Sequence, residues 1–174
     1  NSPGRINLIG EHTDYNEGFV MPTAIDKHIS FKFRRNDTEN FCRIYSDTFS
    51  NGFEFHLDQP LTKQSDWRDY LLGIIHKLQQ KNKLLEGFDC MISSDLPTGA
   101  GISSSAALEC GFCAGLNALF DLNLSEIEIA KISQGAENEF VAINKFNKEY
   151  FNRMFGSLLK IFLTLIFEYF SLSN

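Results

Sequence analysis

The sequence predicts a domain of the α+β class from two periodic patterns and from their order. Short stretches with alternating apolar and polar residues dominate the first third of the chain, and this alternation is the period of a half-buried strand. Later stretches carry an apolar residue every three or four positions, which is the period of an amphipathic helix. Because the strands are grouped before the helices and do not alternate with them one by one, the pattern favours α+β over a βαβ fold.

Four segments in the first part of the chain are predicted as strands. Residues 4–10 hold Ile and Leu between two glycines, which indicates a short strand. Residues 29–34 alternate strictly, with apolar side chains at the odd positions. Residues 41–45 and 53–57 continue this alternation, with an Asn-Gly turn signal at 51–52 between them. We expect the last three of these strands to form an antiparallel meander that leaves one face exposed to water.

Three helices are predicted after these strands, with one more strand between the first two. Residues 67–78 carry an apolar stripe at helical spacing, and residues 88–92 return to the period of a strand. A second helix begins at residue 103, and Ser125 with Glu128 forms the capping box of a third. Small residues on one face of the second helix would allow its backbone to pack closely: Ala107, Cys110, Gly111, Ala114 and Ala118.

The composition is that of a globular protein and excludes several classes. The 174 residues are 43% hydrophobic and 22% charged, which excludes wholesale disorder and a fibrous repeat. The net charge of −6 argues against a protein that binds nucleic acid. Because no secretory leader opens the chain, we expect a cytoplasmic protein. Four cysteines within apolar segments are predicted to be buried thiols of a reducing compartment: Cys42, Cys90, Cys110 and Cys113.

The composition changes after residue 144. Residues 145–174 are rich in Phe and contain neither Pro nor Asp. Their apolar stretch is shorter than the roughly 20 residues of a transmembrane helix, so we expect no membrane span. We therefore divide the chain into a domain at 1–144 and an atypical tail at 145–174.

A glycine-rich turn precedes the second predicted helix. Gly99 and Gly101 lack the Cβ atoms that would keep a phosphate away from the backbone. The serines at 103–105 open the helix, where N–H groups without helical partners favour an anion, and their hydroxyls suit phosphate or Mg²⁺. The turn has neither the Gly-Lys-Ser/Thr ending of a Walker loop nor the spacing of a dinucleotide site. An ordinary helix cap after a flexible turn is the competing interpretation.

A second polar cluster surrounds the first predicted strand. Arg5 lies at one end of this strand, and the sequence Glu-His-Thr-Asp at 11–14 follows its other end. Carboxylates beside hydroxyl groups are what a site for a polyol such as a sugar requires. A solvated turn is the competing interpretation for this cluster alone.

The two clusters together carry a specific resemblance. Residues 3–16, Pro-Gly-Arg-Ile-Asn-Leu-Ile-Gly-Glu-His-Thr-Asp-Tyr-Asn, are similar to the galactokinase signature. Residues 96–108 are similar to the phosphate-binding motif of the GHMP small-molecule kinases, and the similarity covers about residues 2–144. The chain therefore resembles the galactokinases of the GHMP family. This resemblance implies their amino-terminal domain, a mixed or antiparallel sheet with helices packed on one face.

The resemblance implies transfer of a phosphoryl group from ATP to the anomeric hydroxyl of α-D-galactose, which gives galactose 1-phosphate and ADP. Arg5 would stabilise the transferring group, because charge stabilisation dominates phosphoryl transfer. Ser105 and Glu137 would hold Mg²⁺, although Glu137 alone looks like an exposed helix carboxylate. The resemblance implies four residues that bind galactose: Glu11, His12, Thr13 and Asp14. It implies seven that bind the ATP phosphates: Gly99, Ala100, Gly101, Ile102, Ser103, Ser104 and Ser105.

The partners implied are therefore galactose and ATP, without nucleic acid or membrane, and we expect a monomer. The sequence departs from the family pattern where the family carries its catalytic Asp, since Glu149 is the acidic residue nearest that position and its neighbours do not match. The family's carboxy-terminal lobe is also missing. We interpret the chain as a truncated copy, from a frameshift or gene fragment, whose activity the missing Asp puts in question. A non-catalytic regulator that binds galactose and ATP, and a kinase for another small alcohol, are the alternatives.

Overall fold

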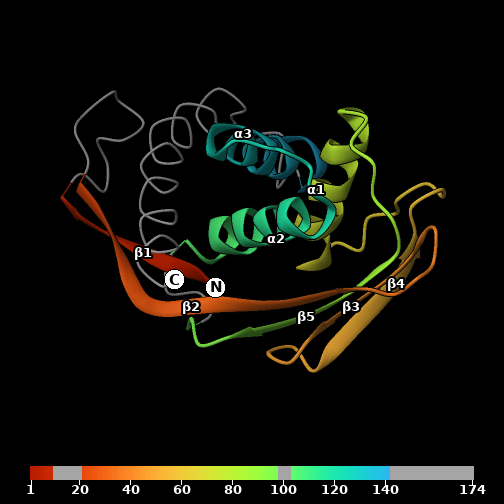
Figure 1. Ribbon diagram of the computed structural model, residues 1–174. Helices are drawn as coiled ribbons and strands as arrows, with labels where there is room; N and C mark the ends of the chain where they lie inside the picture. The colour runs from red at the N-terminus through yellow and green to blue at the C-terminus, as the bar shows by residue number, and fades with distance from the viewer. Residues whose placement is uncertain (10–20, 98–102, 142–174) are drawn as a thin grey trace.

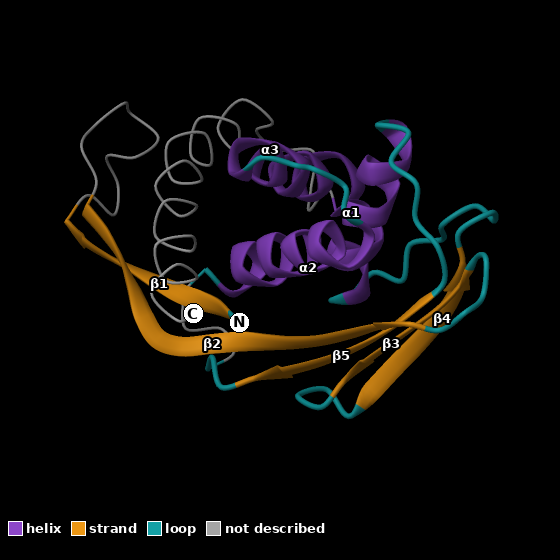
Figure 2. Ribbon diagram, in the orientation of Figure 1, coloured by secondary structure: helices purple, strands orange, loops and turns teal. Residues whose placement is uncertain are grey.

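The computed structural model describes residues 1–9, 21–97 and 103–141, and these form one sheet with helices on one of its faces (Figures 1 and 2). The predicted α+β class is confirmed. The strands are β1 (Ser2–Ile9), β2 (Met21–Arg35), β3 (Phe41–Ser46), β4 (Asn51–His56) and β5 (Phe88–Ser94). The helices are α1 (Arg68–Gln80), α2 (Ser104–Phe120) and α3 (Glu126–Ala136), followed directly by the π-helix η2 (Glu137–Val141).

The order of the strands corrects the predicted meander. The sheet has the order β1-β2-β5-β3-β4, so β5 lies between β2 and β3, which are not neighbours. β5 pairs antiparallel with β2, from Ile29 opposite Ser94 to Arg35 opposite Phe88, and parallel with β3. Phe88, Cys90 and Ile92 are buried on the core face of β5, which suits a central strand. The alternation in the sequence identified the face that each strand buries, but alternation alone does not select the partner of a strand.

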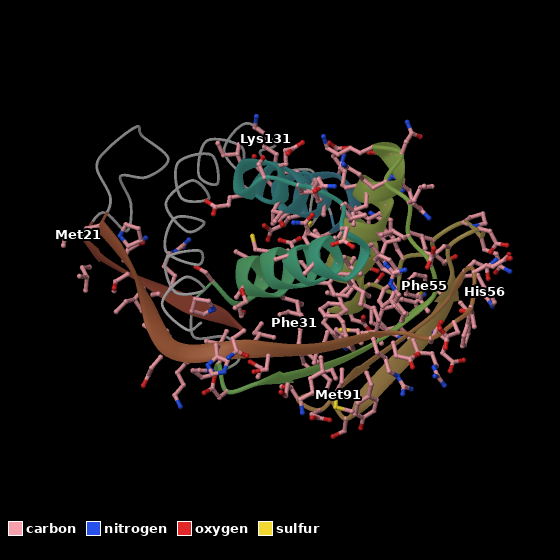
Figure 3. The ribbon with its side chains drawn as sticks, in the orientation of Figure 1. Met21, Phe31, Phe55, His56, Met91 and Lys131 are labelled. Atoms are coloured by element: carbon pink, nitrogen blue, oxygen red, sulfur yellow. The ribbon has the colours of Figure 1, made fainter. Side chains whose placement is uncertain are left out.

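Close packing of α2 on the sheet is confirmed, and glycine makes it possible. A Cβ atom added to Gly111 would overlap the ring of Phe31, and one added to Gly115 would overlap the ring of Phe33. The Phe31 side chain extends from β2 toward α2 (Figure 3). The ring centroids of Phe33 and Phe112 are 5.6 Å apart. Ala118, which the sequence placed on the same face, is exposed.

Two further local predictions are confirmed. Ser125 caps α3 in a capping box with Glu128, whose carboxylate accepts a hydrogen bond from the Ser125 N–H at 2.9 Å. All four cysteines are buried free thiols, and burial raises the pKa of Cys42 and Cys110 to about 12, which keeps them protonated and unreactive. None of the helices in the described ranges has the length and apolar content that crossing a membrane requires.

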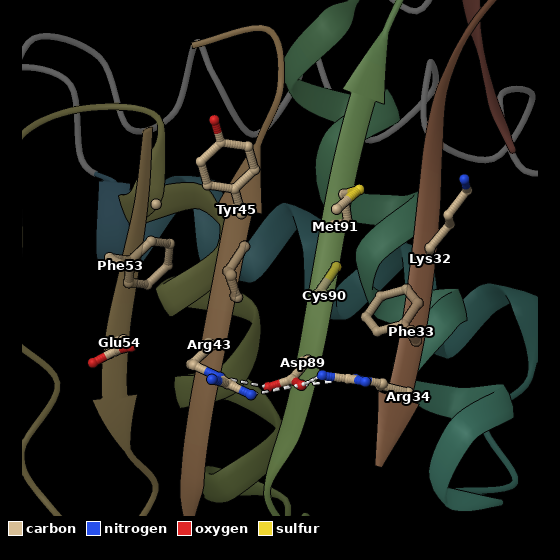
Figure 4. A pocket seen from close by; sticks show the side chains of 12 residues that line it. Lys32, Phe33, Arg34, Arg43, Tyr45, Phe53, Glu54, Asp89, Cys90 and Met91 are labelled. Carbon is tan, nitrogen blue, oxygen red and sulfur yellow. Dashed lines mark hydrogen bonds and ion pairs between the residues drawn. The ribbon is translucent and has the colours of Figure 1, made fainter. Parts of the chain in front are cut away.

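The sheet face opposite the helices is exposed, as predicted, and an ion-pair network crosses it (Figure 4). Asp89 on β5 accepts hydrogen bonds from Arg34 Nε on β2 at 2.8 Å and from Arg43 Nε on β3 at 2.8 Å. The Asp89 side chain is only 15% exposed, and its arginine partners hold the pKa of this carboxyl well below its usual range. One carboxylate thus links three strands.

Replacing Asp89 by asparagine is expected to lower the free energy of unfolding by about 1 kcal/mol near neutral pH. Because the folded pKa is depressed, this contribution is complete above the ordinary carboxyl pKa and is lost progressively as the pH falls from there through the folded pKa, so it is smaller near pH 3. Urea denaturation near pH 7 and near pH 3 would measure the difference. Glu86→Gln is the control, since its ion pair with Arg35 is exposed on both sides. An equal loss for Asp89→Asn at both pH values would contradict this account.

Candidate functional site

A cavity of about 290 Å³ lies where the start of α2 meets the start of α1 and the end of β5. Its walls come from five segments of the chain, so the folded sheet and helices create it. The residues lining it are Ile29, Ser46, Thr48, Phe49, Trp67, Tyr70, Ile92, Ser94, Leu96, Ser104, Ser105 and Leu108.

One wall of the cavity is aromatic. The ring of Phe49, in the turn between β3 and β4, stacks on Trp67 with 5.3 Å between the ring centroids and 14° between the planes. Phe53 on β4 makes an edge-to-face contact with Trp67, with 5.8 Å between the ring centroids. Sequence reasoning placed Trp67 on the apolar stripe of the first helix, whereas α1 begins one residue later and Trp67 is its N-cap. The cavity role of Trp67 was therefore missed.

Two residues of the serine triplet, Ser104 and Ser105, line this cavity at the beginning of α2. Ser103 is the N-cap, with φ 59° and ψ 40°, a left-handed conformation that is uncommon for a residue other than glycine. Its carbonyl accepts the N–H of Ala107 at 3.0 Å, but its side chain makes no capping hydrogen bond. The first turn of α2 therefore keeps the N–H groups that make a helix N-terminus suited to an anion. Residues 99–102 of the predicted phosphate loop lie outside the described residues.

Ser105 and Glu137, the predicted Mg²⁺ ligands, are brought together. Ser105, in the first turn of α2, lies near the carboxylate of Glu137, the first residue of η2, and its hydroxyl lowers the pKa of that carboxyl. Glu137 is buried, at 9% exposed, and not the exposed helix residue that the sequence alone indicated. Burial raises its pKa to about 7, and the nearby Ser105 hydroxyl acts in the opposite direction. A π-helix often occurs at a functional site because it changes where side chains point.

A second acidic side chain, Glu109, is buried beside this pair and was missed by sequence reasoning. It is 1% exposed, and its Oε1 atom has no hydrogen-bond partner. Burial and then the charge of Glu137 raise the pKa of Glu109 well above its ordinary value. Burial, Glu137 and Glu109 together also raise the pKa of Tyr70. The available signal was the spacing of four residues between Ser105 and Glu109, which puts both on one helix face.

The donor atoms present fit Mg²⁺ better than a metal that needs a full protein cage. Within residues 1–9, 21–97 and 103–141, no group of three or more His, Cys, Asp or Glu side chains is placed to hold a metal ion. Magnesium takes hard oxygen ligands, retains several waters, and binds through one or two carboxylates together with substrate phosphates. A serine hydroxyl and one carboxylate beside a helix N-terminus match that requirement. The assignment itself stays a prediction.

The remaining predicted site residues divide between the described and undescribed parts of the chain. Arg5 lies half-buried on β1, opposite Ala24 of β2. β1 packs against α2, since a Cβ added to Gly111 would also meet Ser2. The predicted galactose residues at 11–14, together with Glu149 and the tail at 145–174, lie outside the described residues. Their roles stay predictions.

Two family models match the sequence. The galactokinase galactose-binding signature matches residues 1–35, and the GHMP kinases N-terminal domain matches residues 69–146. The galactokinase of Thermosipho africanus is 41% identical over 143 residues, covering 82% of this chain and 39% of the relative. The galactokinase of Pyrococcus furiosus is 42% identical over 172 residues, covering 97% of this chain and 48% of the relative. The chain thus spans less than half the length of these relatives.

Solved structures agree with the sequence relatives. Lactococcus lactis galactokinase complexed with galactose superposes with a TM-score of 0.75 at 36% identity, covering 83% of this chain and 38% of that one. The mevalonate kinase of Methanococcus jannaschii shares the fold, with a TM-score of 0.68 at 23% identity and coverage of 79% and 44%. The predicted resemblance is confirmed: the chain falls in the GHMP kinase family, as a match to the amino-terminal part of galactokinases.

Proposed function

We propose that this chain provides the nucleotide and sugar sites for phosphoryl transfer from ATP to galactose. The observation that carries the proposal is the position of Ser105, which lines a cavity with an aromatic wall at a helix N-terminus and lies near the buried carboxylate of Glu137. The curated relatives at about 40% identity are named galactokinases, which supports the substrate class. The alternative of a non-catalytic regulator gains no support from these relatives.

Each part of the site suits one part of the ATP molecule. The aromatic wall formed by Phe49 and Trp67 offers an apolar surface against which the base can pack. The first turn of α2 directs N–H groups toward the phosphates, with the hydroxyls of Ser104 and Ser105 as further donors. Ser105 and Glu137 would hold Mg²⁺, which neutralises charge on the phosphates when it is bound.

The sugar side of the reaction depends on residues outside the described ranges. Glu11, His12, Thr13 and Asp14 would hold the galactose hydroxyls by hydrogen bonds, which select for a sugar that carries those hydroxyls. The Arg5 guanidinium would stabilise the negative charge on the group in transfer. Glu149 is proposed only as the positional counterpart of the family's catalytic Asp.

Tryptophan fluorescence tests the nucleotide site directly, because Trp67 is the single tryptophan of the chain. We expect a non-hydrolysable ATP analogue with Mg²⁺ to change the emission of the full 174-residue chain saturably. Ser105→Ala should weaken this binding about tenfold or more, since it removes a ligand and a donor. Ser30→Ala on β2 is the control, because Ser30 bonds Asn1 and does not line the cavity.

The same preparation tests the reaction. Incubation with ATP, Mg²⁺ and galactose should give ADP and galactose 1-phosphate in equal amounts, and glucose should not replace galactose. An unchanged emission spectrum at millimolar nucleotide, together with no sugar phosphate, would refute the proposed function for this chain.

A further inference from the structure

A buried carboxyl group that no proposed step uses lies one helical turn beyond Ser105. Glu109 follows Ser105 by four positions on α2, a spacing that places two side chains on one helix face with about 5–6 Å between their Cβ atoms. The Ser105 hydroxyl acts on the carboxyl of Glu137, and the charge of Glu137 acts on Glu109. The three side chains therefore form one cluster, which we call the acidic cluster, between α2 and η2.

The acidic cluster is unfavourable as it stands. Glu109 is 1% exposed, its Oε1 atom has no hydrogen-bond partner, and none of the ion pairs among the described residues includes it. Among the residues that the structure describes, the charge that acts on Glu109 is that of another carboxylate, Glu137. The charges of both carboxyls also act on Tyr70. Burying a carboxyl without a partner costs free energy that an apolar side chain of similar size would not.

A divalent cation at Ser105 and Glu137 would remove this cost. Two carboxylates balance the charge of one divalent cation, and magnesium keeps several of its waters when it binds to protein. A coordinated water is a strong donor, and groups that accept from it orient the direct ligands of the metal. The unpartnered Oε1 atom of Glu109 is an acceptor of the required kind.

We propose that Glu109 is a positioning residue of the cation site, which supplies the second negative charge and accepts a hydrogen bond through Oε1 from a water bound to the cation. This inference rests on the proposed nucleotide and Mg²⁺ site. The competing interpretation is a core residue that fills space between α2 and its neighbours and has no effect on cation binding.

Titration with Mn²⁺ separates the two interpretations without reference to turnover. Free Mn²⁺ is followed by electron paramagnetic resonance in the full chain, in the presence of a non-hydrolysable ATP analogue. Glu109→Gln keeps the shape of the side chain and removes its charge, so we expect the Mn²⁺ dissociation constant to rise about tenfold or more. The melting temperature of the metal-free variant should be equal to or above that of the wild type, because an unpartnered buried acid has been removed.

Two further variants serve as controls for the role of the Glu109 charge. Glu109→Asp keeps the charge and should retain part of the affinity that Glu109→Gln loses. Glu139→Gln, in the same π-helix but with its carboxylate exposed and paired with Lys77, should leave Mn²⁺ binding unchanged. Unaltered Mn²⁺ affinity in Glu109→Gln, alongside loss of binding in Glu137→Gln, would overturn the inference and leave the proposed function standing. A wild-type chain that binds no Mn²⁺ would overturn both.

Discussion

Glu137→Gln is expected to lose Mg²⁺-dependent nucleotide binding and, at the same time, to be more stable than the wild type in the absence of metal above about pH 7. Both effects have one cause. The Glu137 carboxyl is buried beside Ser105, and burial raises its pKa to about 7. Because the buried carboxyl has lost its hydration, its charged form destabilises the fold. The same charged form is the one that binds a divalent cation.

The pH range follows from the direction of the shift. Because the folded pKa lies above the ordinary carboxyl value, the folded protein retains the proton between about pH 4.5 and pH 7 while the unfolded chain has lost it. The stabilisation is complete below the unfolded pKa and disappears as the pH rises through the folded pKa. By this linkage the ionisation of Glu137 costs the metal-free wild type about 2–3 kcal/mol across the range, and Glu137→Gln lacks this contribution while it keeps that of Glu109.

Urea denaturation in a chelating buffer near pH 5 and near pH 8 would measure the effect. Mg²⁺ with the ATP analogue should restore the stability of the wild type near pH 8 and have no effect on the variant. Glu139→Gln should behave as the wild type, because its carboxylate is exposed. If the wild type and Glu137→Gln lose the same amount of stability as the pH rises, the Glu137 carboxyl is not the cause.

The elements of the fold could be predicted from the sequence because each depends on a local pattern. Each of these patterns lies within one segment and predicts the secondary structure, the buried face or the end of that segment. The examples are the alternation in 29–34, the apolar stripe in 67–78 and the capping box at Ser125. The position of β5 between β2 and β3 depends on which strands meet after folding, and no local pattern records it. The aromatic wall at Trp67 was missed for the same reason, since Phe49 reaches it from the turn between β3 and β4.

The acidic cluster could not be predicted from the sequence for a different reason. The stripe of small residues on α2 predicted one buried face, and Glu109 lies away from that stripe. α2 also packs against α1 and α3, so its other face is buried as well. Phe112, Cys113 and Leu116 are fully buried with Glu109 for this reason. Motif resemblance identified Ser105 and Glu137 together, but only the layer of helices above α2 explains why Glu137 is buried.

Gly115→Ala is expected to destabilise the fold by about 2 kcal/mol, although alanine is the better helix former. In an exposed helix the same change would gain up to about 1 kcal/mol. At Gly115 the new Cβ would overlap the ring of Phe33, which is held against Phe112 and stacked on Phe31, so the ring has little room to move. Overpacking a close-packed interface costs about 1–3 kcal/mol, which exceeds the gain in helix propensity.

Gly135→Ala in α3 is the matched control for this prediction. A Cβ added there would meet only the flexible side chain of Lys77, so this variant should be equal to or above the wild type in stability. Urea denaturation of both variants measures the contrast. Phe33→Leu combined with Gly115→Ala should recover part of the loss, because the two sites share one contact and their effects are not additive. A Gly115→Ala variant as stable as Gly135→Ala would mean that α2 does not approach β2 closely. The cavity beside Ser105 depends on that approach, so its shape and position would then be wrong.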